Sequence, residues 1–192
     1  MAQTSHQNVG DLIGQFLSVA DLLEDAQLAQ LYAYLARRDE ATVQQLMDDL
    51  DIPQGTAYSY VNRLVEAGLF EVTRDEQPRA YAARSIELTV QSPTQNREYT
   101  ISPALIDAVG RRTTDDDIDT YIDRHGVAGL ATALNYTKAR ERGEVTHRMM
   151  ADDLDISPLA AEMILQALRQ SVLQYEDLEA SGESTPDIEG EY

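Results

Sequence analysis

Hydrogen-bonding side chains that could read DNA gather in residues 54–63 and in the segment that follows. Arginine can form two hydrogen bonds with guanine, and asparagine or glutamine can pair with adenine. Serine, threonine and tyrosine hydroxyls reach base edges or phosphates. The candidate DNA contacts are Gln54, Thr56, Tyr58, Ser59, Asn62 and Arg63, joined by Arg74 and Arg79 as candidate phosphate contacts. This grouping predicts double-stranded DNA as a partner.

A short helix, a tight turn and a second helix are predicted over residues 42–66, where most of these side chains lie. Thr42 and Gln45 form the capping-box pattern at the start of the first helix. Gly68 provides the left-handed stop that commonly follows a helix. Apolar residues at helical spacing should face inward and leave the polar side chains outside. These inward-facing residues are Ala57, Val61 and Leu64.

One helix before this pair and one hairpin after it complete the expected domain. Asp25 can cap a helix over 26–37, and alternating residues predict strands at 69–73 and 79–83 with Arg74 and Arg79 beside the turn. Three helices followed by a hairpin predict a winged helix-turn-helix domain. We place it at residues 25–102, because a further hairpin is expected at 86–90 and 97–101.

The remaining chain reads as helical, so the predicted fold is mainly α with a small β-wing. Residues 1–24 are expected to form an amphipathic helix, residues 103–174 a C-terminal helical domain, and residues 175–192 an acidic disordered tail. Helix ends are expected at Gly143 and near Arg112. Apolar residues offered as possible dimer contacts are Leu12, Phe16 and Leu17 near the N-terminus and Met163, Ile164 and Leu168 near the C-terminus.

The segment DDLDI occurs twice, at 48–52 and again at 152–156. The likeness extends to Thr42 and Thr146, each of which can cap a helix, so a second helix-turn-helix is predicted. Residues 159–168 are apolar almost all round, which is typical of a buried helix. We therefore expect a structural or dimer-forming copy and not a second DNA reader.

The formal net charge of -19, from 34 acidic and 15 basic residues, opposes contact with a polyanion. Residues 54–84, however, balance four arginines against four carboxylates, so the acidity lies elsewhere in the chain. Lys138 is the one lysine. An aspartate-rich, lysine-poor chain resembles proteins of salt-in halophiles, and at molar salt distant repulsion is screened beyond about 3 Å. A haloarchaeal origin is expected.

Composition also excludes several classes of function. Without cysteine, and with only three histidines, the sequence favours neither a thiol catalyst nor a metal site. We find no phosphate loop, dinucleotide fingerprint or nucleophile elbow, so we expect a protein that is not an enzyme and needs no cofactor. No apolar run is long enough for a membrane span, and no signal sequence precedes the domain. A cytoplasmic protein is expected.

The segment TVQQLMDDLDIPQGTAYSYVNRLVEAGLFEV at 42–72 resembles the winged-helix regulators of archaea and bacteria, especially the TrmB-like and ArsR-like groups. The likeness covers about residues 25–84. It implies a sequence-specific transcriptional regulator that binds double-stranded DNA as a homodimer. The alternative is an acidic winged-helix module that binds proteins, or a DNA mimic that occupies a basic partner.

Overall fold

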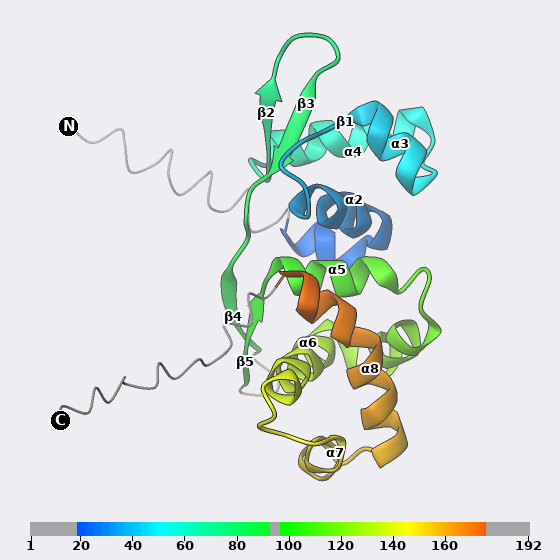
Figure 1. Cartoon of the computed structure of the whole chain (residues 1–192), viewed down its shortest axis with the longest axis vertical. Coiled ribbons are helices and arrows are strands. Elements are labelled where there is room, and N and C mark those ends of the chain that lie inside the picture. Colours follow the sequence, from blue (N-terminus) through cyan, green and yellow to red (C-terminus); the bar gives the residue numbers. More distant parts are fainter. Residues whose placement is uncertain (1–18, 93–96, 176–192) are drawn as a thin grey trace, which may run out of the picture.

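The computed structural model describes residues 19–92 and 97–175 and places a winged helix-turn-helix domain at one end of the molecule and a helical layer at the other (Figure 1). The fold is mainly helical with a small antiparallel sheet, which confirms the predicted class. Within the described ranges, no helix is both long enough and apolar enough to span a bilayer.

The winged domain follows the predicted order. Its elements are α2 (Ala26–Ala36), β1 (Ala41–Thr42), α3 (Val43–Leu50), α4 (Gln54–Glu66), β2 (Phe70–Arg74) and β3 (Ala80–Ala83). The capping box of Thr42 and Gln45 is present, and Gly68 ends α4 with a φ of 71°. The strand β1 was not predicted, because two residues are too few to show the alternation of apolar and polar side chains that indicates a strand. It makes β3 the central strand in the order β1-β3-β2.

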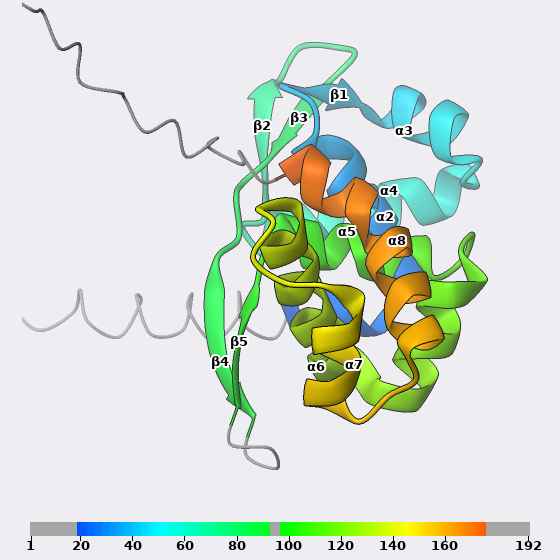
Figure 2. The ribbon, with the colours of Figure 1, turned by 60° about the horizontal axis from the view of Figure 1, so that its bottom comes forward.

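A second hairpin leads into the C-terminal helices. Its strands are β4 (Leu88–Ser92) and β5 (Arg97–Ile101), followed by α5 (Pro103–Arg111), α6 (Asp116–Glu141), α7 (His147–Leu154) and α8 (Pro158–Tyr175). Figure 2 shows the hairpin running beside α6, which β5 contacts. The first strand begins two residues later than predicted. The preceding segment lies against α2 instead, where the Tyr32 hydroxyl donates to the Arg84 carbonyl over 2.8 Å.

Helix α2 lies between the rest of the winged domain and the C-terminal helices (Figure 1). Apart from two glutamines its sequence is apolar, and such a helix is stable only when most of its surface is covered. The crossing with α5 is unusually close. A Cβ atom added at Gly110 would lie 2.9 Å from the backbone nitrogen of Gln30 and 3.1 Å from its Cα. Glycine at this position therefore sets the distance between the two helices.

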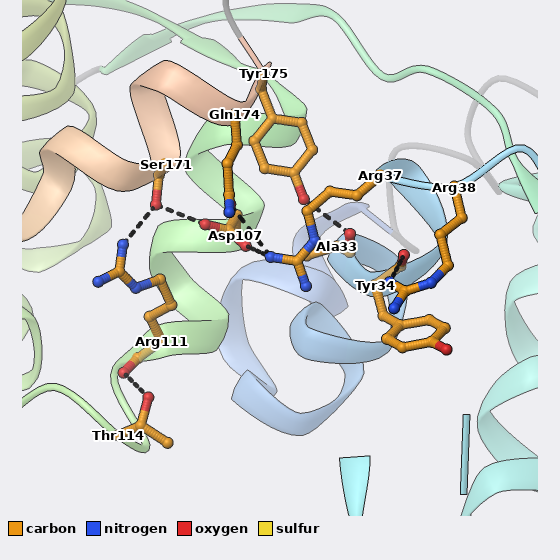
Figure 3. Close-up of polar contacts among 10 residues, drawn as sticks. All are labelled: Ala33, Tyr34, Arg37, Arg38, Asp107, Arg111, Thr114, Ser171, Gln174 and Tyr175. Carbon is orange, nitrogen blue, oxygen red and sulfur yellow. Dashed lines mark hydrogen bonds and ion pairs between the residues drawn. The ribbon is translucent and has the colours of Figure 1, made fainter. Parts of the chain in front are cut away.

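A buried polar network joins α2, α5 and α8 at one end of this crossing (Figure 3). The carboxylate of Asp107 is 3% exposed and accepts hydrogen bonds from Arg37 at 3.1 Å and from the Ser171 hydroxyl at 2.6 Å. Tyr175 donates to the Ala33 carbonyl at 2.8 Å. Burial and the nearby Asp107 raise the pKa of Tyr175 well above its usual range, so its hydroxyl remains a donor.

Helices α7 and α8 form the second helix-turn-helix expected from the repeated DDLDI. Thr146 caps α7 as Thr42 caps α3, and both turns pass through a left-handed aspartate, Asp51 and Asp155, each with a φ of 52°. A tyrosine on the preceding helix contacts the equivalent aspartate in both copies. Tyr34 donates to Asp49 at 2.6 Å, and Tyr136 donates to Asp153 at 2.8 Å.

One expectation about α8 is wrong. Ile164 and Leu168 were offered as dimer contacts, but they lie in the core of their own chain. Met163, offered with them, is 43% exposed and Leu159 is 70% exposed, because α5, α6 and α7 leave one side of the helix uncovered. The predicted N-terminal helix with Leu12, Phe16 and Leu17, and most of the acidic tail, lie outside the described residues.

The close crossing of α2 and α5 predicts the effect of substituting Gly110. Gly110→Ala should lower the free energy of unfolding by about 1–3 kcal/mol, because the new methyl group meets backbone atoms that cannot turn aside. At about 2–4 °C per kcal/mol for a chain of this size, thermal unfolding should record the loss.

The matched control for this substitution is Gly55→Ala in α4, where an added Cβ has no neighbour within 4 Å. It should leave the melting temperature unchanged or slightly raised, because alanine favours a helix. Equal melting temperatures for the two variants would show that the crossing is not tight.

Candidate nucleic-acid interface

The outer face of α4 carries most of the predicted contact residues. Ala57, Val61 and Leu64 are buried as expected, which turns the intervening side chains away from the core. Thr56 is half-buried, and Tyr58 is 47% exposed. The exposed predicted contacts on this helix are Gln54, Tyr58, Ser59, Asn62 and Arg63. The structure therefore gathers donors and acceptors on one accessible helix face.

The N-terminus of α4 lacks a side-chain cap. Pro53 occupies the capping position, and its side chain has no hydrogen-bond acceptor. Ala57 is the first residue whose N–H bonds within the helix, to the Pro53 carbonyl at 3.0 Å. The N–H groups of residues 54–56 remain available, and such groups favour a phosphate oxygen. We did not predict these donors, although proline directly before a helix indicates that no side chain caps its N–H groups.

Tyr60 lies on the inner side of α4 and joins it to α2. Its hydroxyl donates to one carboxylate oxygen of Asp25 at 2.7 Å, and the other oxygen accepts from the backbone N–H groups of Gln27 and Leu28 at 3.0 Å. The hydrogen bond to Asp25 and partial burial raise the pKa of Tyr60. The tyrosine therefore fixes the orientation of α4 and is not a groove contact.

The predicted cations of the interface are already paired with carboxylates. Arg63 forms an ion pair with Asp21 in the helical segment 19–24, and Arg79 pairs with Asp75 at 2.9 Å. Arg74 donates to the Pro78 carbonyl at 3.1 Å and lies 4.0 Å from Glu40. These pairs are exposed, where an ion pair contributes about 0–1 kcal/mol. Phosphates could therefore replace the carboxylates at small cost.

The wing projects beyond the helices, with Arg74 and Arg79 on either side of its exposed turn (Figure 1). Sequence reasoning placed both arginines correctly at the turn. It did not predict the partner of Arg74, because Glu40 lies far away in the sequence.

The second helix-turn-helix provides a comparison within the same chain. In α8 the N-terminus is capped, since the Ser157 hydroxyl accepts from the Ala160 N–H at 3.1 Å. At the positions equivalent to Gly55, Ser59 and Arg63, α8 has Leu159, Met163 and Ala167. The two helix-turn-helix units therefore share a backbone arrangement but differ in surface. Helix α4 has exposed polar side chains and open N–H donors, whereas α8 is capped and has apolar side chains at the three positions compared.

Matches to two family models fit this division. Residues 27–87 match the family model described as sugar-specific transcriptional regulator TrmB, and residues 112–177 match a family of unknown function (DUF7437). The chain is also 32% identical over 122 residues to the DNA-directed RNA polymerase III subunit rpc3 of Emericella nidulans. That match covers 62% of this chain and 17% of the subunit, so the chain spans less than a fifth of that relative. No solved structure matches significantly.

The first match covers α2 through β3, so the winged domain is similar to the one in TrmB regulators. The second match covers α6, α7 and α8. Within the described residues, no group of three or more histidine, aspartate or glutamate side chains could hold a metal ion.

The contact between Tyr60 and Asp25 predicts a pH-dependent effect. Tyr60→Phe should cost about 1 kcal/mol at pH 8, the usual net value of one hydrogen bond. Because the folded pKa is raised above 10.0, this stabilisation is fully present below about pH 10 and is lost as the pH rises through the folded pKa. The deficit of the variant in thermal unfolding should therefore shrink above about pH 10.

Tyr58→Phe is the control, because the exposed Tyr58 hydroxyl has no partner among the described residues. It should match the parent protein at every pH. A Tyr60→Phe deficit that stays constant across the titration would contradict the contact.

Proposed function

We propose that this chain is a sequence-specific, DNA-binding transcriptional regulator that is not an enzyme and inserts α4 into the major groove. The observation that carries the proposal is the face of α4, where an uncapped N-terminus and exposed Gln54, Ser59 and Asn62 occur together. The N-terminal half of the second helix in a helix-turn-helix contacts base edges, which supports a role in recognition for Gln54 and Ser59 and, further along the helix, Asn62. The similarity to TrmB regulators supports the same function.

We also propose that the protein works at high salt, as its composition suggests for a haloarchaeal source. Close arginine–phosphate pairs survive at ionic strengths that screen the repulsion between DNA and the remote acidic surface. The exposed arginine–carboxylate pairs beside α4 could then open towards phosphates. A wider likeness to ArsR-like regulators remains a prediction.

The test is selection of bound duplexes from a randomised DNA library in concentrated potassium chloride, followed by affinity measurements on the enriched sequence. Asn62→Ala should weaken binding of that sequence by about 5- to 150-fold, since one good base contact discriminates by about 1–3 kcal/mol. Asn135→Ala is the control, because Asn135 is an exposed asparagine of α6, far along the chain from α4. It should bind as the parent does.

Failure to enrich any sequence with folded protein would overturn the DNA-binding function. It would favour the alternative of an acidic protein-interaction module or DNA mimic. Two observations support that alternative: every predicted arginine contact is already paired with an acid or a carbonyl, and the chain resembles part of a polymerase subunit.

A homodimer is the form in which we propose that the protein binds DNA, with α8 as the contact. Five exposed residues follow one another at spacings of four and three, which is the spacing of a helix–helix seam. The α8 stripe consists of Leu159, Met163, Gln166, Gln170 and Leu173. It holds no charge in a chain whose surface is otherwise rich in carboxylates.

Light scattering at high salt tests this assembly. The parent protein should have the mass of a dimer, and the double variant Leu159→Glu, Met163→Glu the mass of a monomer, because four carboxylates would face one another in the seam. Met149→Glu changes an exposed methionine of α7 outside the α8 stripe and should stay dimeric. A monomeric parent would contradict the proposal.

A further inference from the structure

A groove of about 480 Å³ lies where α6 bends, away from α4 and the wing. It is lined by Tyr121, Arg124 and His125 from the first half of α6, by Gly129 and Thr132 from the second half, and by Leu154 and Ile156 at the end of α7 and in the turn that follows. Its volume is within the range of about 300–1,000 Å³ that is typical of small-molecule sites. The function proposed above gives this groove no role.

Two glycines build the groove. Gly126 interrupts α6 with a φ of 68° and a ψ of 178°, a conformation that is essentially restricted to glycine. The bend brings His125 so close to the following turn that a Cβ atom at Gly129 would lie 2.5 Å from the His125 Cβ. The hollow therefore depends on specific backbone positions and is not an accident of side-chain packing.

Arg124 gives the groove a positive charge that has no ion-pair partner. Among the arginine side chains that the structure describes, Arg124 and Arg148 alone have no carboxylate partner. No aspartate or glutamate lines the groove itself. In a chain with a net charge of -19, an unpaired guanidinium in a hollow marks a site for an anion.

The walls of the groove favour a ligand with a flat apolar part. The rings of Tyr121 and His125 lie with centroids 4.4 Å apart at an angle of 37°. Leu154 and Ile156 line the same hollow. Burial raises the pKa of Tyr121, so its ring stays neutral and its hydroxyl can donate. An aromatic ring could pack between these walls with its charged group at the rim.

Only one negative charge fits this arrangement. A smaller adjoining hollow shares Tyr121, Arg124 and His125 and is also lined by Asp117. A second negative charge on the ligand would be repelled there. We propose that the groove binds a small aromatic monocarboxylate, with its carboxylate on the Arg124 guanidinium and its ring between Tyr121 and the α7–α8 turn. This site is independent of the proposed DNA-binding function.

Benzoate is the probe, titrated into the full-length protein at the salt concentration that keeps it folded and followed by amide chemical shifts. We expect saturable binding at millimolar concentration, with the largest amide shifts among the residues that line the groove, Gly129 and Thr132 included. Arg124→Gln should weaken binding at least about tenfold, because a hydrogen bond to a charged group is lost. Since Arg124 is exposed, the variant should fold.

Arg148→Gln is the matched control, because it removes the other unpaired arginine, which lies on α7 outside the groove. It should bind benzoate as the parent does. On the parent protein, neutral benzamide and non-aromatic acetate should each bind much more weakly than benzoate.

Three outcomes would overturn the proposal. They are no saturable binding of benzoate by the folded parent, equal affinities for the parent and Arg124→Gln, and benzamide or acetate binding as tightly as benzoate. The last comparison needs no variant, so it decides the question even if Arg124→Gln fails to fold.

Discussion

The buried carboxylate of Asp107 is the constraint on which the arrangement of the helices depends. A charge removed from water is costly unless it is paired and hydrogen-bonded, and the partners of Asp107 come from two other helices. Arg37 follows α2 and Ser171 belongs to α8, so the carboxylate is satisfied only when all three helices meet correctly. One turn further along α5, Gly110 allows the backbone of α2 to approach closely. Because α2 is also the first helix of the winged domain, these contacts fix α4 relative to the C-terminal helices.

Much of the winged domain could be predicted because its signals are local. The capping box at Thr42, the stop at Gly68 and the spacing of Ala57, Val61 and Leu64 each depend on residues within a few positions of one another. The face of α4 followed directly from that spacing. The missing side-chain cap of α4 is an equally local feature, because it follows from proline at the capping position.

What sequence reasoning missed depends on contacts between distant segments. The pairing of Arg63 with Asp21 joins residues whose proximity is set by how the segment before α2 packs. The exposure of Leu159 and Met163 depends on which side of α8 is covered by α6 and α7, and the apolar content of the helix gave no hint of this. Strand β1 exists only because β3 lies beside it. Local pattern therefore predicts elements well, but it does not predict which of their faces meet.

The paired arginines beside α4 have a consequence for the ions that accompany binding. DNA releases condensed cations when arginines neutralise its phosphates, which makes most such complexes weaken steeply with added salt. Under the DNA-binding function proposed here, each arginine that turned to a phosphate would leave behind a carboxylate, such as Asp21 or Asp75, which would then attract a cation of its own. Cation uptake by the protein would offset cation release from the DNA. The net number of ions exchanged would be small, and so affinity would vary little when the salt concentration of the cell changes.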